Sequence, residues 1–249
     1  MRHFAALILA LIAPVFALAA QPLAAQQIVY QEVTEEIVEV PATGSERFVG
    51  AQVQPFVPAI PQGLAAYGPF RVLNGSRAAL VDVTDERSPG QFSAMLRAFP
   101  GIRVLEMVEC PGTEDDRANL RLGRLIRARG LATHVPAGGS VRSGAVELFL
   151  AGAQRIADPG SEFAVHSWSD EFGLEPKDYA ADGPENRAYI DYYRELGMSE
   201  TEARAFYGMT NSVPNADAKW LSAGEMARWV RLDAAQMADA RLDSGLAVN

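Results

Sequence analysis

The sequence has a single cysteine, three histidines and fewer basic side chains than acidic ones. One cysteine, Cys110, excludes an internal disulfide, so the stability of the fold must come from packing. The formal net charge of -9 and the isoelectric point of about 4.9 disfavour phosphate backbones and anionic headgroups as partners. The composition therefore argues against a nucleic-acid-binding protein and against a protein of the membrane surface.

Long apolar runs are also scarce, and the single one lies at the N-terminus. Residues 4–20 form this run, and its end contains the small residues Ala17 and Ala19. This combination is typical of a Sec signal peptide. We therefore expect residues 1–25 to be removed and the mature protein to be exported, into the periplasm or out of the cell, with no membrane span. A retained anchor is the alternative, although Pro14 interrupts the run. The absence of a cysteine after the run argues against a lipoprotein.

The rest of the chain divides by composition. Residues 26–69 are rich in proline with little periodicity, which predicts an N-terminal arm. Residues 70–232 carry regular patterns and are long enough for one domain with a substantial core. Residues 233–249 are expected to form a C-terminal tail.

Strand and helix patterns alternate in the domain. Apolar runs predict strands at residues 78–83, 102–109, 131–136 and 162–167, and patterns of period 3.6 predict helices at 88–99, 115–129 and 143–152. Further helices are expected at 184–196, 199–207 and 222–230. Such alternation predicts an α/β fold with a mostly parallel sheet, helical crossovers and C-terminal helices. Ligands gather at the carboxyl ends of such strands.

Two residues at these strand ends suggest nucleophilic catalysis. Ser143 begins the apolar pattern SGAVELFLAG, and His166 ends the strand-like run EFAVHS. Histidine is the usual base for a serine nucleophile, and free amides at a helix start stabilise an oxyanion, so Gly144 is one candidate donor and Gly112 a second. No Gly-x-Ser-x-Gly elbow surrounds Ser143. A capping serine and an ordinary core histidine therefore remain the alternative.

Three other features have structural explanations. His134 lies within the predicted strand LATHVP, and Cys110 has no assignable partner histidine. The acidic residues 114–116 suit a helix N-terminus rather than a metal site. No Walker sequence occurs, and we expect neither a metal nor an organic cofactor.

The order of these motifs resembles the ClpP/crotonase superfamily, especially the proteolytic subunit of the Clp protease and its exported relatives. VECPGT matches the family's Pro-Gly-Gly type turn, and SGAVELFLAG matches its serine helix with Ser143 as nucleophile. The loop containing Arg155 leads to AVHS, with His166 as the base. Leu221–Ala223 matches the family's Leu-Ser-Ala helix start. The resemblance covers residues 70–232 and implies a spiral of strand-strand-helix units.

Two departures from the family affect the turn and the serine helix. Thr113 replaces the second glycine of the turn, which retains an amide but restricts positive φ angles. Glu147, four residues after Ser143 and on the same helical face, replaces an apolar residue. It is a carboxylate acting in the site, a buried charge with an unseen partner, or a subunit-interface residue.

The third departure is the acid that orients the histidine. The family's position for this aspartate is occupied by Pro214, and Asp217 is the nearest carboxylate. Asn211 and Asn215 could also orient an imidazole through an amide oxygen. A catalytic triad with Asp217, or a Ser-His dyad with a weaker third partner, are the two possibilities.

The resemblance implies a serine hydrolase that cleaves short or unfolded peptides without ATP and assembles into a homo-oligomer. Ser143, His166 and Asp217 would be catalytic, and Gly112 and Gly144 would form the oxyanion hole. The alternative is a non-catalytic, ClpP-like binding or scaffold module of the cell envelope. Acyl-CoA chemistry of the crotonase kind would leave the match at Ser143 and His166 unexplained.

Overall fold

The computed structural model describes residues 59–234. The predicted signal peptide, residues 26–58 of the predicted arm and residues 235–249 of the tail lie outside the described residues. Across the described range, no helix combines the length and the apolar character needed to cross a bilayer.

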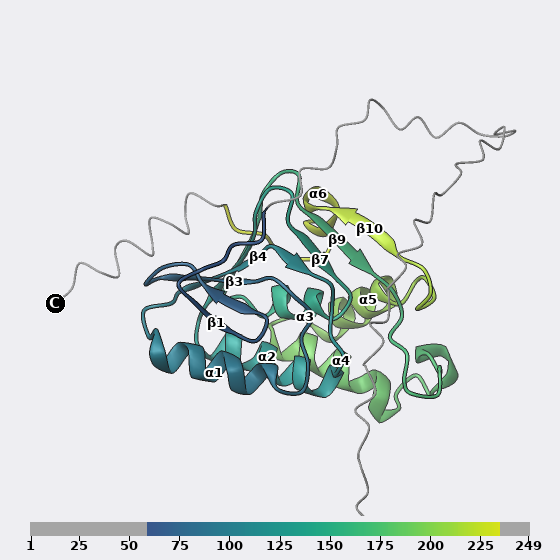
Figure 1. Ribbon diagram of the computed structural model, residues 1–249. Helices are drawn as coiled ribbons and strands as arrows, with labels where there is room; N and C mark the ends of the chain where they lie inside the picture. Colours follow the sequence, from purple (N-terminus) through teal and green to yellow (C-terminus); the bar gives the residue numbers. More distant parts are fainter. Residues whose placement is uncertain (1–58, 235–249) are drawn as a thin grey trace, which may run out of the picture. The chain divides into compact units, whose positions relative to one another are not determined.

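The strands of this region form two sheets (Figure 1). The first has the order β1-β2-β3-β4-β6-β8, and the second the order β10-β9-β7-β5. The strands of the first sheet are β1 (Ala65–Tyr67), β2 (Phe70–Val72), β3 (Arg77–Leu80), β4 (Val104–Met107), β6 (Ala132–Val135) and β8 (Gln154–Ala157). Those of the second are β5 (Glu109–Cys110), β7 (Ser140–Arg142), β9 (Glu162–Val165) and β10 (Lys219–Ser222).

The helices follow these strands in a repeating order. They are α1 (Ser88–Ala98), α2 (Asp116–Ala128), α3 (Ala145–Leu150), α4 (Pro184–Glu195), α5 (Glu200–Thr210) and α6 (Ala223–Met226), with a 3₁₀ turn at Pro176–Asp178. The chain runs β4-β5-α2, then β6-β7-α3, then β8-β9-α4. Neighbours β3, β4, β6 and β8 are parallel, as are β5, β7 and β9. The predicted mostly parallel, strand-strand-helix architecture with C-terminal helices is confirmed.

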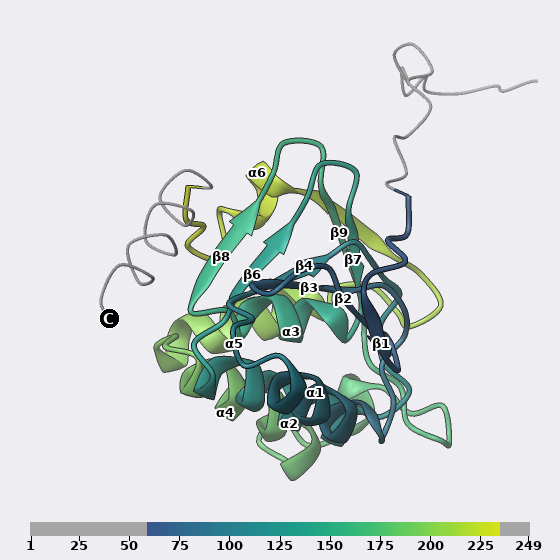
Figure 2. The same ribbon diagram turned by 60° about the vertical axis from the view of Figure 1, so that its left-hand side comes forward.

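Helix α3 lies at the centre of this arrangement. All six of its residues are buried, because the strands cover one side and helices α2 and α4 lie on the other (Figures 1 and 2). Phe149 of α3 packs on Phe163 of β9 at a ring-centroid distance of 4.9 Å. The start of α3, and the loop before it, are therefore held by packing on two sides.

The structure differs from the sequence-based expectation at several strands. β1 lies in the segment expected to be an arm, and it pairs antiparallel with β2, so the folded domain starts before residue 70. β7 and β8 are only three and four residues long and fall where a loop was expected, and β10 pairs antiparallel with β9. The predicted strand at 102–109 divides at Val108 between the two sheets. Short strands with one or two buried residues give too little periodicity to be recognised.

Gly152, after α3, allows a close approach to Thr133 of β6. A Cβ atom at this position would lie 2.2 Å from Thr133 Oγ1 and 2.5 Å from the backbone oxygen of Gln154. Thr133 is buried and donates to Phe149 O at 2.7 Å, so it cannot turn away without losing that bond. We expect Gly152→Ala to lower the free energy of unfolding by about 2 kcal/mol in urea denaturation.

Gly208 provides the matched control for this substitution. It lies in α5, and a Cβ added there meets nothing within 4 Å. Gly208→Ala should be neutral or stabilising by about 0.5–1 kcal/mol, because alanine favours a helix. Equal effects of the two substitutions would contradict this account of Gly152.

Candidate functional site

Ser143 has a strained backbone between β7 and α3. Its φ of 50° is the only positive φ of a non-glycine residue among residues 59–234. The Ser143 amide donates to Ala164 O of β9 at 2.8 Å, and Ser143 O accepts from the Val146 amide at 2.9 Å. Sheet pairing and the first turn of α3 thus hold Ser143 in a conformation that is costly for a residue with a side chain. Such strain is concentrated at functional sites, and no local motif in the sequence indicates it.

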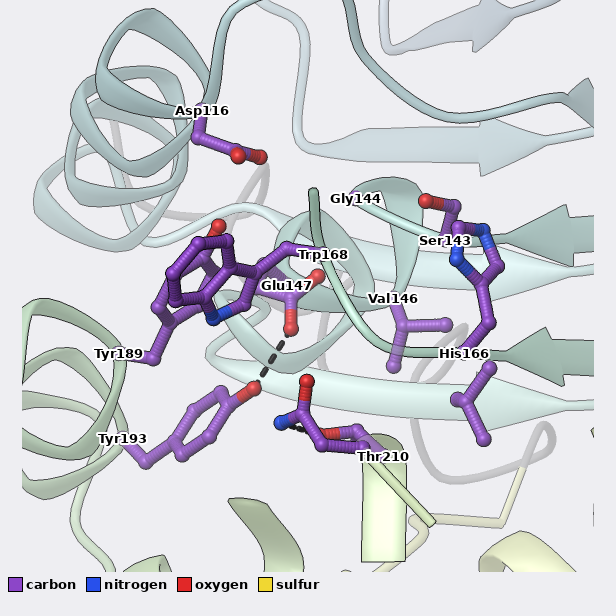
Figure 3. A pocket seen from close by; sticks show the side chains of 12 residues that line it. Asp116, Ser143, Gly144, Val146, Glu147, His166, Trp168, Tyr189, Tyr193 and Thr210 are labelled. Carbon is purple, nitrogen blue, oxygen red and sulfur yellow. Dashed lines mark hydrogen bonds between the residues drawn. The ribbon is translucent and has the colours of Figure 1, made fainter. Parts of the chain in front are cut away.

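Ser143 and His166 line the same pocket, as the sequence predicts for a reacting pair. His166 directly follows β9, and the parallel pairing of β7 with β9 brings the ends of both strands together. In Figure 3 these two side chains lie at one side of the pocket, and acidic and aromatic side chains lie at the other. Within the described part of the chain, Ser143 Oγ and the His166 ring form no hydrogen bond with each other.

The His166 ring is oriented through its Nδ1 atom. Nδ1 lies 2.9 Å from Ser167 O and 3.1 Å from Asn215 Nδ2, and Asn215 Nδ2 donates to Ser167 O at 2.8 Å. A carbonyl oxygen only accepts, so its contact with Nδ1 is attractive when Nδ1 carries a hydrogen. The Asn215 amide nitrogen beside the same atom is a donor and favours the opposite tautomer, so these contacts hold the ring in place without selecting its tautomer.

The contacts of His166 do not match the prediction that Asp217 orients its ring. Asp217 forms no hydrogen bond or ion pair with His166 among the described residues, and Asn215, from the same loop, lies beside the ring instead. The two positions are only two residues apart, and a loop without periodicity does not show which side chain faces inward. The asparagine acts through its amide nitrogen on Ser167 O, not through its amide oxygen as the sequence suggested.

The predicted oxyanion turn lies against Ser143. Gly112 has a φ of 137°, and a Cβ there would lie 3.0 Å from Ser143 Cβ, so this position needs glycine for both its conformation and the close approach. The amides of Gly112 and Gly144 donate to no acceptor within residues 59–234. The Thr113 hydroxyl donates to Thr84 O at 3.2 Å, so the threonine joins the turn to the segment before α1.

Asn119 is a positioning residue that sequence reasoning missed. It is buried on α2, and its Nδ2 donates to Gly144 O at 2.6 Å. Its Oδ1 accepts from the Thr84 hydroxyl at 3.1 Å. This pair of bonds fixes the Gly144 peptide relative to the turn. The available signal was an asparagine among the apolar positions of an amphipathic helix, where an unpaired amide would be costly.

Glu147 is a buried carboxylate that faces the pocket. Its residue is 5% exposed, and its Oε1 accepts from the Tyr193 hydroxyl at 2.6 Å. Burial raises the pKa of Glu147 to about 7, and the hydrogen bond from Tyr193 only partly offsets that rise. Three alternatives were open for Glu147 from the sequence, and the structure shows a buried carboxylate that has a hydrogen-bond partner in the same chain and lines the pocket.

The remaining candidates have the structural positions that the sequence suggested. His134 Nε2 lies 3.0 Å from Asp158 Oδ2, and the residue does not line the pocket. Cys110 is buried, and desolvation raises the pKa of its thiol. Asp115 caps α2 by accepting from the Ala118 amide at 2.8 Å. No group of three or more metal-ligating side chains is present in the described region.

Comparison with protein-family models and with curated proteins finds no match. Among solved structures, the chain is similar to a ClpP1 mutant from Listeria monocytogenes, with 15% identity, a TM-score of 0.47, and coverage of 64% of this chain and 90% of the other. A serine-to-alanine mutant of the 1510-N membrane-bound stomatin-specific protease has 16% identity, a TM-score of 0.41 and coverages of 62% and 78%. A candidate enoyl-CoA hydratase from Streptomyces avermitilis has 16% identity and a TM-score of 0.48, with coverage of 74% of this chain and 76% of the other. These likenesses concern the fold, so the activity has to be inferred from the chain's own residues.

Proposed function

We propose that this chain is an exported serine hydrolase of the ClpP type, which cleaves peptides with Ser143 as nucleophile and His166 as base. The observation that carries the proposal is the strained Ser143, which shares a pocket with a histidine whose Nδ1 is held by a backbone carbonyl. A capping serine does not require a strained backbone, and an ordinary core histidine does not require a place beside that serine in a pocket. This combination favours catalysis over the structural alternative.

The proposed reaction has two stages. Ser143 Oγ bonds to the carbonyl carbon of the substrate as its proton passes to His166 Nε2, and the amides of Gly112 and Gly144 stabilise the oxyanion. The carbon–nitrogen bond breaks as Nε2 returns the proton to the departing amine. Water, deprotonated by Nε2, then attacks the ester, releases the acid and restores Ser143. Ser167 O, with Asn215 beside it, keeps His166 in the required orientation.

The proposed substrates and assembly follow from the sequence. An exported protein has no ATP to drive unfolding, so short or already unfolded peptides are the expected substrates. The reaction uses side chains and backbone amides alone. A homo-oligomer is expected from the family resemblance, and the activity should be measured on the assembled protein.

The test of the proposal is intact-mass spectrometry after treatment with a fluorophosphonate probe. We expect one adduct on the wild-type protein, localised to Ser143, absent from Ser143→Ala and strongly reduced in His166→Ala. Ser140→Ala is the matched control, because this serine lies on β7, the strand directly before Ser143, and its hydroxyl donates to Glu162 Oε1 at 2.9 Å. It should retain the adduct. An unlabelled wild-type protein that is folded and assembled would overturn the proposal.

The second candidate function is a non-catalytic binding module for a peptide or an envelope component. Two observations favour it: Ser143 Oγ forms no hydrogen bond with His166, and the residue beside Nδ1 is an amide rather than a carboxylate. The pocket would then bind a ligand without reacting. Failure of the fluorophosphonate to label the protein is the result that this function predicts.

A further inference from the structure

The side of the pocket opposite Ser143 combines two carboxylates with aromatic rings. Glu147 lies one turn along α3 from Ser143, and Asp116 of α2 lines the same pocket. Trp168 and Tyr189 lie beside them (Figure 3) with their rings stacked, at a centroid distance of 6.2 Å and an interplanar angle of 8°. Carboxylates and aromatic faces together are the surroundings that bind an ammonium or guanidinium group.

These carboxylates have no ion-pair partner in the described part of the chain, although His166, which lines the same pocket, partly offsets the rise in the pKa of Asp116 that burial causes. Neither Asp116 nor Glu147 forms an ion pair with a residue between 59 and 234, although basic side chains elsewhere in this range pair with many of its acids. Glu147 is 5% exposed, and its hydrogen bond comes from a neutral hydroxyl. A cation stabilises a buried carboxylate, so a positively charged group of a ligand that enters this pocket would be bound there.

A second cavity continues from the pocket past Asp116, Trp168 and Tyr189, which line both. Its other acidic side chains are Glu114, Asp170, Glu171 and Glu185, with Arg117 as the one basic side chain among its lining residues. The negative surroundings of the pocket therefore extend outward along a groove. A substrate with positive charge would be attracted along its whole length.

We propose that this pocket selects a lysine or arginine side chain at P1, the substrate residue whose carbonyl Ser143 attacks. The proposal rests on the proposed hydrolase function, because it assigns the substrate of the same site. Glu147 binds the cation at the end of the pocket, Asp116 adds a second negative charge, and Trp168 and Tyr189 pack along the aliphatic stem. Glu147 and Asp116 are thus specificity-determining residues.

The experiment compares two peptidyl diphenyl phosphonates that differ only at P1, where one carries lysine and the other norleucine. Ser143 Oγ bonds to phosphorus, a phenoxide leaves, and the serine proton passes to His166, so the rate reports phosphonylation of the serine, which requires the same activated nucleophile as acylation. The two side chains have the same straight four-carbon stem. We expect the lysine probe to label the protein about 10–100-fold faster, the range for a hydrogen bond to a charged group.

Glu147→Gln keeps the shape of the side chain and removes its charge. This substitution should reduce the ratio of the two rates at least tenfold. Glu195→Gln is the matched control, because Glu195 is paired with Arg124 on the exposed side of α4 and does not line the pocket. It changes the net charge equally and should preserve the ratio. A general effect of net charge would lower the ratio in both variants.

The ratio is also expected to rise between pH 6 and pH 8, as Glu147 ionises. The titratable groups that face Glu147 are Asp116 of α2, Tyr189, Tyr192 and Tyr193 of α4, Tyr207 of α5, and His166. The tyrosines stay neutral in this range, because their pKa values are raised. Both probes react through the same serine and histidine, so a change in the reactivity of this pair cancels from the ratio.

The outcomes separate this proposal from the proposed function. If neither phosphonate nor the fluorophosphonate labels Ser143, the hydrolase function itself is wrong. If the fluorophosphonate labels Ser143 but norleucine reacts as fast as lysine, the selection of a cation is wrong and the hydrolase function stands. An unchanged ratio in Glu147→Gln would also overturn the assignment of Glu147.

Discussion

Replacing His166 with glutamine is expected to slow the phosphonylation of Ser143 by about 10²–10⁴-fold, measured as the labelling rate with a fluorophosphonate. Glutamine retains polar bulk beside Ser167 and Asn215, but it cannot accept the serine proton at neutral pH. The serine hydroxyl is a poor nucleophile without a base, so the loss falls on the chemical step. The effect is the largest that we expect from a substitution other than that of the nucleophile itself.

His134→Gln is the matched control for this prediction. His134 is the other histidine of the described region, and it contacts Asp158 and Arg77 rather than the pocket. The His134→Gln variant should be labelled at close to the wild-type rate under conditions where both variants are folded. A comparable loss in the two variants would mean that the effect comes from structural damage, and a normal rate in His166→Gln would remove the histidine from the mechanism.

Replacing Glu147 with glutamine is expected to change the pH dependence of stability by about 3 kcal/mol. The pKa of Glu147 is about 7 in the folded chain, against 4.5 for an unperturbed glutamate. Between these values the folded state holds a proton that the unfolded state has lost, so stability falls as pH rises through this window. Above pH 7 the whole penalty of a buried carboxylate is present. Glutamine stays neutral and avoids it.

Urea denaturation at pH 4.5 and at pH 8 measures this effect directly. The difference in unfolding free energy between Glu147→Gln and wild type should shift in favour of the variant by about 3 kcal/mol from the lower to the higher pH. The hydrogen bond with Tyr193 contributes at both pH values and largely cancels from this shift. Glu195→Gln, which alters an exposed ion pair, should show a shift below about 1 kcal/mol. Parallel pH profiles of wild type and Glu147→Gln would contradict the buried, raised-pKa carboxylate.

Much of the fold was predictable because its long elements have strong local patterns. The amphipathic α2 and the apolar β4 and β6 stand out in the sequence, and their alternation indicates parallel strands. β7 and β8 were not recognised, because each is short and has few buried residues. The division of the 102–109 run between two sheets depends on hydrogen bonds to strands far away in the sequence, such as that from the Val108 amide to Leu80 O.

The site shows the same division between residue type and geometry. Ser143, His166 and Gly112 could be chosen from the sequence, because Ser143 begins an apolar helical pattern, the other two follow predicted strands, and all three are of types that nucleophilic catalysis uses. The positive φ of Ser143 and the place of Asn215 beside His166 could not, since both arise from contacts between separate segments. Asp217 was favoured because carboxylates are the usual partners of a catalytic histidine. Local charge in a loop does not show which side chain turns inward.

By itself, the sequence determined the alternation of strands and helices, the residues able to react, and the negative charge that disfavours anionic partners. These follow from periodicity and residue chemistry, which act locally. Only the tertiary structure decided that Glu147 is buried opposite Ser143, that Asp116 and two aromatic rings complete the same pocket, and that neither carboxylate forms an ion pair within residues 59–234. Burial and the absence of an ion pair are properties of the packed chain, because they depend on which segments exclude water from the carboxylate.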